Sequence, residues 1–197
     1  FFMSFRKEEK IETTFYQQKL LLDKIIKLGG KLLYPSRRIS SIYFDSKNFE
    51  MHNESEEGIL PRKKIRIRYY NNDQENSNLE YKISSFEGRY KTTNKLNLGL
   101  LNRYLREGCV DQKYGFCYPI IKITYDRRYY TLNNVRITFD DNIIYQNFNS
   151  KIKILDEAGV VELKSKKDKG IEDIDKILPL TRKRFSKFSR AFSYLNI

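Results

Sequence analysis

The sequence predicts an α+β domain dominated by antiparallel β-strands. Runs of alternating apolar and charged residues, such as "KKIRIRYY" at 63–70, recur along the chain and have the two-residue period of a half-buried strand. A few other segments have the spacing of an amphipathic helix instead. No internal repeat, low-complexity segment or linker interrupts the 197 residues, so we expect one domain spanning residues 1–197.

The N-terminal part predicts a strand followed by a helix. Residues 5–11 alternate, which places Arg6, Glu8 and Lys10 on one strand face. Thr13 or Thr14 then caps a helix over residues 15–28, and Gly29 and Gly30 end it. The expected apolar stripe of this helix is formed by Phe15, Leu21, Leu22, Ile25 and Leu28.

Strands and one helix are expected in the middle of the chain. The β-rich runs at 39–45 and 62–70 predict two strands, and 79–84 predicts the hairpin partner of the second, across a polar turn at 71–78. A strand at 88–93 precedes a helix at 95–107, which ends at Gly108. The apolar side of that helix is formed by Leu96, Leu100, Leu101, Tyr104 and Leu105.

The C-terminal part returns to strands and ends in helices. Strands are expected at 119–127, 135–141 and 159–166, and a short helix at 171–178 stops before Pro179. Apolar residues then recur at three, four and three positions, which is the core stripe of a last helix; they are Phe185, Phe188, Phe192 and Leu195. Earlier in the chain, His52 lies in a polar loop and is expected at the surface.

The composition favours a polyanionic partner. The net charge is +13 and the pI about 9.6, which suits nucleic acid, anionic lipid or phosphate chains. With two cysteines, Cys109 and Cys117, and one histidine, neither a disulfide-rich domain nor a Cys–His zinc site is expected. The sequence has no P-loop, Rossmann or nucleophile-elbow motif.

Hydropathy and the N-terminal residues predict the subcellular location of the protein. No apolar run approaches the roughly 18–20 residues needed to span a bilayer, and residues 1–4 lack a signal-peptide pattern. We therefore expect a cytoplasmic protein, either free or held at the cytoplasmic face of a membrane by a membrane-protein partner. The oligomeric state is not predicted.

Charged residues share one face of each predicted strand. They are Lys64, Arg66 and Arg68; Glu80 and Lys82; Arg89 and Lys91; Arg136 and Asp140; and Glu162 and Lys164. The solvated outer face of a half-covered sheet explains this alternation. A phosphate site also explains it, because Arg binds phosphate in a bidentate manner and a repeated Glu-x-Lys pattern puts a ligand for a divalent cation beside a positive charge. In a closed barrel, these faces would line a wet interior.

Short motifs spread over nearly the whole chain resemble one family. In chain order they are Arg6-x-Glu8-x-Lys10, "SIYFDS" (41–46), "RKKIRIRYY" (62–70), "LEYKIS" (79–84), "YDRRYY" (125–130), "VRITFDD" (135–141), "VELK" (161–164) and "FSKF" (185–188). Together they resemble the VTC domain, the polyphosphate polymerase branch of the CYTH-like triphosphate tunnel metalloenzymes.

The resemblance implies both a fold and an activity. The fold would be a closed antiparallel barrel of about eight strands with helices packed outside. Its tunnel would bind ATP or another triphosphate with a divalent metal, Mn²⁺ or Mg²⁺, and transfer the γ-phosphate of ATP to a growing polyphosphate chain. Triphosphate and polyphosphate are therefore the expected partners, and nucleic acid is not.

The resemblance also implies the site residues. The basic phosphate-binding positions are Lys10, Arg66, Arg68, Arg127, Arg136 and Lys187, all but Arg136 with a catalytic role as well. Secondary phosphate contacts on the same strand faces are Lys64, Lys82, Lys91 and Lys164. The metal-binding glutamate is Glu162, while Glu8 and Glu80 either support the metal or pair with neighbouring cations.

Some positions and the exact activity remain open. Ser40 stands where family members often have Arg, with Arg38 two residues earlier as a replacement, and either Arg127 or Arg128 points inward. Two other functions fit the same sequence. One is an inorganic or nucleoside triphosphatase with water as the acceptor, for which Glu8 or Glu80 could position the water. The other is a non-catalytic domain that binds polyphosphate or another polyanion.

Overall fold

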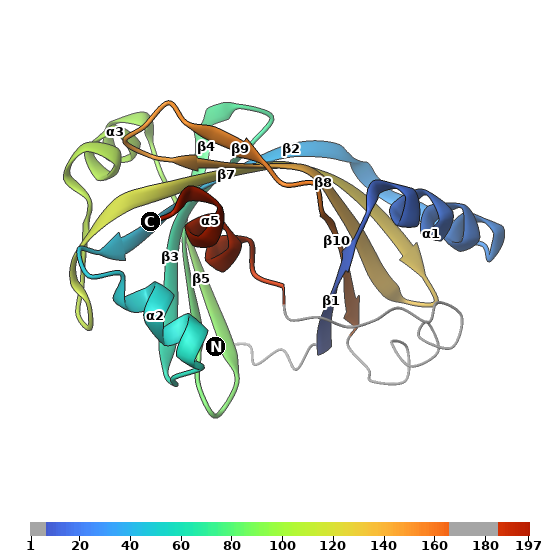
Figure 1. Cartoon of the computed structure of the whole chain (residues 1–197), viewed down its shortest axis with the longest axis horizontal. Coiled ribbons are helices and arrows are strands. Elements are labelled where there is room, and N and C mark those ends of the chain that lie inside the picture. The colour runs from blue at the N-terminus through green and yellow to red at the C-terminus, as the bar shows by residue number, and fades with distance from the viewer. Residues whose placement is uncertain (1–6, 166–184) are drawn as a thin grey trace. The chain divides into compact units, whose positions relative to one another are not determined.

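The computed structural model describes residues 7–165 and 185–197 (Figure 1). Its elements, in chain order, are β1 (Lys7–Thr13), α1 (Phe15–Lys27), β2 (Lys31–Ser46), α2 (Glu50–Glu57), β3 (Arg62–Tyr70), β4 (Asp73–Ser84), β5 (Arg89–Lys95), α3 (Leu98–Glu107), β6 (Cys109–Asp111), β7 (Gly115–Leu132), β8 (Val135–Asn147), β9 (Lys153–Leu155), β10 (Gly159–Ser165) and α5 (Lys187–Leu195). The short helix expected at 171–178 lies outside the described residues, as do Arg6 and Pro179.

The strands form a ten-stranded sheet with the order β1-β10-β8-β7-β2-β3-β4-β5, in which β6 also pairs with β7 and β9 with β8. Five ladders along this order are antiparallel, namely β1–β10, β10–β8, β2–β3, β3–β4 and β4–β5, and so is the β6–β7 ladder beside it. This confirms the predicted α+β class with a large antiparallel sheet. β1 and β5 stand at the two ends of the order, and no ladder joins them among the described strands, so the expected closed barrel is not detected.

The chain divides into two compact units, and each has its own core. The first unit comprises residues 1–37, 125–143 and 155–185, and the second comprises residues 38–124, 144–154 and 186–197. The long strands β2, β7 and β8 each contribute residues to both units. The two units carry the two groups of charged residues considered below.

In the first unit, α1 covers the apolar face of β1, β10 and β8. Thr14 caps this helix as predicted, because its hydroxyl accepts from the Gln17 amide at 3.2 Å and Gln17 Oε1 accepts from the Thr14 amide at 2.8 Å. Leu21 and Ile25 pack against Ile137 and the residues around it. The expected stripe is wrong at its ends: Phe15 is 72% exposed and Leu28 46%. Successive residues of a helix are rotated by about 100°, so Phe15, six residues before Leu21, points about 120° away from it around the helix axis.

In the second unit, the core lies under β2, β3 and β4. Ile65 and Ile67 on β3 are fully buried beside Phe44 and Leu79, as the alternation predicts. The polar turn predicted at 71–78 is wrong beyond its first two residues, since β4 already begins at Asp73. The turn needs only Asn71 and Asn72, which have φ of 51° and 62°; asparagine tolerates this left-handed region, and a two-residue hairpin turn requires it.

The helices of the second unit differ in part from the prediction. α3 spans Leu98–Glu107 with Gly108 as its C-cap, and it lies against β4. Residues 50–57, expected as a loop, form α2, which lies against β3 and α5 (Figure 1). His52 is therefore not a surface loop residue: it is half-buried, and its ring stacks on Phe192 of α5 with centroids 3.8 Å apart. In the described parts of the chain, we find no helix of the length and apolarity needed to cross a membrane.

Candidate functional site

Seven polar side chains from β2, β3, β4 and β5 lie on the face of the sheet that points away from the core of the second unit. Side chains alternate along a strand, so burying Ile65 and Ile67 places Lys64, Arg66 and Arg68 together on the opposite face, where they are half-buried. The register sets Tyr43 of β2 and Glu80 of β4 on either side of Arg66. We call this group the β3 cluster: Tyr43, Lys64, Arg66, Arg68, Glu80, Lys82 and Lys91.

Glu80 is the acidic centre of the β3 cluster. Its carboxylate accepts from Arg66 Nε at 2.7 Å and from Lys91 Nζ at 2.6 Å, and Arg68 Nη1 lies 4.0 Å away. Burial by itself would raise the pKa of Glu80, but the charges of Arg66, Arg68 and Lys91 lower it to about 2. Glu80 is therefore ionised at neutral pH. It pairs with its neighbours, which is one of the two roles expected for it.

Tyr43 holds Arg66 from the other side. Its hydroxyl accepts from Arg66 Nη1 at 2.9 Å, and its ring packs on Phe188 of α5 with centroids 4.9 Å apart. Burial would raise the pKa of Tyr43, yet the charges of Arg66, Arg68 and Lys64 and the hydrogen bond from Arg66 lower it to about 7. A tyrosine that ionises so easily reports a strongly positive local potential.

A row of three lysines extends the β3 cluster across its strands. Lys64, Lys82 and Lys91 occupy directly opposed positions on β3, β4 and β5. Like charges at opposed positions disfavour the sheet, and a bound polyanion would relieve that repulsion. Lys187 is the first residue of α5, and Ser186 is its N-cap. The Ser186 hydroxyl accepts a hydrogen bond from Lys64 Nζ at 3.2 Å.

A second charged group lies in the first unit, on β1, β10, β8 and β7. Lys10 opposes Glu162, and Glu162 in turn opposes Thr138; two residues along, Glu8 opposes Lys164 and Lys164 opposes Arg136. The apolar residues between them face the core under α1. We call this group the β10 cluster: Glu8, Lys10, Arg127, Arg136, Thr138, Asp140, Glu162 and Lys164.

Glu162 is, together with Asp140, one of the two buried carboxylates of the β10 cluster. It is only 5% exposed, and Lys164 Nζ lies 2.5 Å and Arg127 Nη2 3.5 Å from its oxygens. Burial would raise the pKa of Glu162, but the charges of Lys164, Arg127 and Lys10 hold it well below its usual range. Glu8 forms ion pairs with Lys10 at 3.3 Å and with Lys164 at 3.2 Å.

The structure distinguishes the two neighbouring arginines of β7. Arg127 belongs to the β10 cluster: it forms a bidentate pair with Asp140, at 2.5 Å and 2.7 Å, in addition to its contact with Glu162. Arg128 instead donates to Gln18 of α1 at 3.1 Å and to Asp141 at 2.8 Å. Of these two, Arg127 is therefore the one that belongs to the charged cluster.

Two buried polar atoms of the β10 cluster have no hydrogen-bond partner among the described residues. They are Arg136 Nε and Thr138 Oγ1 on β8, whereas Glu162 Oε1 is held by Lys164 Nζ at 2.5 Å. Buried polar groups are normally hydrogen-bonded, because leaving one unsatisfied costs about 1–3 kcal/mol. Two such atoms on one face of β8 indicate a place where a polar ligand can bind.

The donor set of the β10 cluster fits a hard divalent cation held mainly by its substrate. Nowhere in residues 7–165 and 185–197 do three or more His, Cys, Asp or Glu side chains form a group that could hold a metal by themselves. Mg²⁺, however, is commonly bound through one or two carboxylates, with substrate phosphates and water completing its shell. Glu162 offers a buried, ionised carboxylate for this purpose, and Glu8 lies two residues along the same ladder.

Ser40 and Arg38 do not extend either cluster. Ser40 is buried opposite Tyr69, on the face of β2 that carries Ile42. Arg38 shares that face by alternation, whereas Tyr43 and its partner Arg66 belong to the other. The replacement of the family arginine by Arg38 is therefore not supported by the geometry.

Three members of the clusters were not expected as site residues. Tyr43 lies within the "SIYFDS" motif, and Thr138 and Asp140 share the face of Arg136 in "VRITFDD". The alternation of side chains along each strand places all three residues on its polar face, so the sequence did contain a signal for their position. Their partners could not be inferred, because the pairing of Tyr43 with Arg66, or of Asp140 with Arg127, depends on the register between strands.

Comparisons with known proteins give the family and the fold of the chain. The family model described as the VTC domain matches residues 5–196. Among solved structures, a Bacillus halodurans protein named as a candidate adenylate cyclase superposes with a TM-score of 0.64 at 13% identity, covering 93% of this chain and 96% of that one. Protein PH1819 of Pyrococcus horikoshii gives 0.58 at 14%, covering 95% and 99%.

A third similar structure comes from the plant Hippeastrum. It is HpAC1, described as an adenylyl cyclase candidate with a dominant triphosphatase activity, and it gives a TM-score of 0.61 at 12% identity, covering 95% of this chain and 96% of that one. Identities this low show the fold alone. No curated protein sequence matches the chain. The family model nevertheless covers nearly every residue, and the chain belongs to the VTC domain family.

Proposed function

We propose that the protein is an ATP-dependent polyphosphate polymerase, which transfers the γ-phosphate of ATP to a growing polyphosphate chain with the help of a divalent metal. Membership of the VTC domain family supports this proposal, and so do the two clusters, which are rich in arginine and lysine. The closed tunnel that the family resemblance implies is part of the proposal.

The environment of Glu162 carries the proposal. Glu162 is a buried, ionised carboxylate with three cations around it, Lys10, Arg127 and Lys164. On the neighbouring strand β8, Thr138 Oγ1 and Arg136 Nε have no hydrogen-bond partner among the described residues. A purely structural ion-pair network would not leave these two groups unsatisfied, whereas a metal–phosphate ligand would supply acceptor oxygens for the guanidinium and the hydroxyl and would use the carboxylate as a metal ligand.

Phosphoryl transfer needs positioning and charge neutralisation more than covalent help from the protein. In the proposed reaction, a terminal phosphate oxygen of the chain forms a bond to the γ-phosphorus, the bond from that phosphorus to the β–γ bridging oxygen breaks, and ADP leaves. The attacking oxygen is already anionic at neutral pH, so no strong base is required.

Each cluster has a role in this reaction. The arginines Arg66, Arg68, Arg127 and Arg136 bind and orient phosphate oxygens, and the lysines Lys10, Lys64, Lys82, Lys91, Lys164 and Lys187 add positive charge. Glu162, supported by Glu8, would hold the metal, while Glu80 fixes Arg66. A bound Mn²⁺ or Mg²⁺ would neutralise the negative charge of the phosphoryl oxygens.

A triphosphatase is the second candidate. The observation that favours it is the structural likeness to Hippeastrum HpAC1, whose dominant activity is that of a triphosphatase. The same residues would then bind the triphosphate while water accepts the phosphoryl group. A polymerase and a triphosphatase differ in their products and not in the charge pattern of the site.

The products of ATP turnover test the proposal. Purified protein would be incubated with ATP and Mn²⁺, and the products resolved on a gel that separates phosphate chains by length. We expect a ladder that disappears with a chelator and with Glu162→Ala. Glu157→Ala, which changes an exposed glutamate in the loop before β10, is the matched control and should leave the ladder intact.

Other results would overturn the polymerase. Free phosphate without a ladder, lost in Glu162→Ala, would establish the triphosphatase instead. Binding of polyphosphate without metal-dependent turnover, weakening steeply with salt, would mean a non-catalytic polyanion-binding domain.

A further inference from the structure

The first unit exposes a concentration of large apolar side chains on α1 and the start of β2. Of the seventeen exposed large apolar residues in the described chain, eight fall within residues 15–34. The most exposed are Phe15 (72%), Tyr16 (67%), Leu32 (61%), Ile26 (52%) and Leu20 (51%). Single exposed apolar residues are ordinary, but a concentration like this marks an interaction surface.

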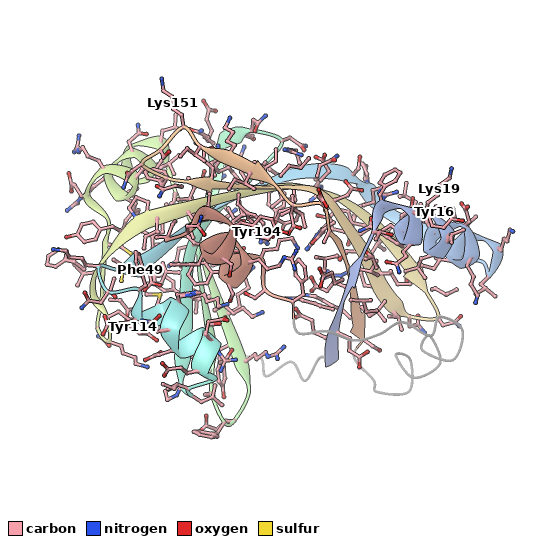
Figure 2. The ribbon with its side chains drawn as sticks, in the orientation of Figure 1. Tyr16, Lys19, Phe49, Tyr114, Lys151 and Tyr194 are labelled. Carbon is pink, nitrogen blue, oxygen red and sulfur yellow. The ribbon has the colours of Figure 1, made fainter. Side chains whose placement is uncertain are left out.

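The members of this set that belong to α1, namely Phe15, Tyr16, Leu20 and Ile26, lie on the side of the helix that faces away from the sheet. Gln18, Leu21 and Ile25 are the buried residues of the helix, whereas Phe15 and Ile26 emerge on the other side. Figure 2 shows Lys19 projecting outward from α1, with Tyr16 on the same helix. This outer side is thus not needed to hold the first unit together.

Lysines alternate with the apolar residues of this surface. Lys19, Lys24, Lys27 and Lys31 are all exposed, and Asp23 is the sole acidic residue within 15–34. We call the exposed side chains of residues 15–34 the α1–β2 patch. Its combination of Phe, Tyr, Leu and Ile with lysines around them is typical of a helix that lies in the interface of an anionic bilayer.

The charge of the patch argues against self-association. In a twofold dimer the same surface meets itself, so two surfaces with an excess of lysine would face each other, and juxtaposed like charge across an interface is unfavourable. An anionic lipid surface instead attracts every lysine, while the apolar side chains enter the headgroup region.

We propose that the α1–β2 patch docks the protein on an anionic membrane surface. Phe15, Tyr16, Leu20 and Ile26 insert between the headgroups, and Lys19, Lys27 and Lys31 contact lipid phosphates and carboxylates. This proposal does not depend on the reaction proposed above, because none of these residues belongs to the β3 or β10 cluster.

A tryptophan reporter tests the docking directly. The chain contains no tryptophan, so Tyr16→Trp introduces a single probe in the patch. Phe86→Trp places a matched probe in the second unit, at a residue that is 84% exposed in the wild type. We expect vesicles of phosphatidylcholine with phosphatidylserine to shift the Tyr16→Trp emission to shorter wavelength, and brominated lipid to quench it. The Phe86→Trp emission should not change.

Vesicle sedimentation measures how much the lysines and the aromatic residues of the patch each contribute to membrane binding. Removing one lysine near an anionic surface should weaken binding about fivefold, which corresponds to about 1 kcal/mol. The double variant Lys19→Gln/Lys27→Gln should therefore bind about 25-fold more weakly, and Phe15→Ser/Tyr16→Ser should also lose binding. Phe86→Ser is the apolar control, and Arg66→Gln shows whether lipid binds at the β3 cluster instead. Circular dichroism checks that each variant is folded.

Three outcomes would overturn the proposal. The first is no binding of the wild type to phosphatidylserine vesicles in low salt. The second is binding that the patch variants leave unchanged, or that Arg66→Gln alone abolishes. The third is a dimer in sedimentation equilibrium that Phe15→Ser/Tyr16→Ser dissociates, which would assign the patch to self-association.

Discussion

Replacing Glu80 with glutamine tests the electrostatics of the β3 cluster. The carboxylate accepts from Arg66 and Lys91 and lies near Arg68. Glutamine keeps the shape of the side chain and one acceptor oxygen but removes the negative charge. The variant therefore leaves three cations close together without their shared counter-charge, and we expect it to be less stable at neutral pH.

The pKa of Glu80 gives the size of the effect. It falls from 4.5 to about 2, and about 1.4 kcal/mol per pKa unit gives roughly 3 kcal/mol. Solvent screening around the half-exposed Lys91 reduces this to about 2 kcal/mol. Because the pKa is lower in the folded state, the stabilisation is complete above pH 4.5 and is lost as the pH falls towards 2.

Urea unfolding of the wild type and Glu80→Gln, from neutral pH downward, measures this difference. We expect a gap of about 2 kcal/mol at neutral pH that narrows below the ordinary pKa of glutamate. Glu107→Gln removes a carboxylate from exposed ion pairs with Arg103 and Arg106 and should change little. A gap for Glu80→Gln that stays constant with pH would refute the electrostatic explanation.

Three further predictions concern single groups. Absorbance at the phenolate band should show one tyrosine titrating near pH 7 in the wild type but not in Tyr43→Phe, and added tripolyphosphate should move that titration to higher pH because its charge opposes the phenolate; an unchanged titration in Tyr43→Phe would contradict this. Thr14→Ala removes the α1 capping box and should cost about 1 kcal/mol in thermal unfolding, whereas no loss would mean that the cap does not contribute. Ile137→Ala empties a fully buried position in the first core and should cost about 2–5 kcal/mol; a cost well below that range would mean that the core closes over the space.

Sequence alone predicted the elements whose signal is local. The strand at 62–70 matches β3, because strict alternation of Ile with Lys and Arg allows only one face to be buried. The capping of α1 by Thr14 rests on a residue directly before the helix. α2 was missed since Phe49 at its start provides no side-chain cap. The cap comes instead from Asp45, which accepts from the amides of Met51 and His52.

The composition of each cluster was largely predictable, but its internal pairing was not. A period of two assigns Arg66, Arg68 and Glu80 to polar faces, and Glu162 and Lys164 likewise. Which cation meets which carboxylate depends on register, and register is set by contacts between distant segments. For this reason Asp140, fully buried and paired with Arg127, was not recognised as part of the site. The roles given to the site residues remain predictions.

Binding of tripolyphosphate, measured by calorimetry in the presence of Mg²⁺, tests most directly the claim that both clusters bind phosphate. Arg66→Gln changes the β3 cluster, Arg127→Gln changes the β10 cluster, and Arg103→Gln changes an exposed arginine of α3 as the matched control. The proposal predicts that each cluster variant binds at least about tenfold more weakly, as expected for the loss of one charge-assisted contact, while the control is unchanged. Unchanged affinity in either cluster variant would contradict the claim for that cluster.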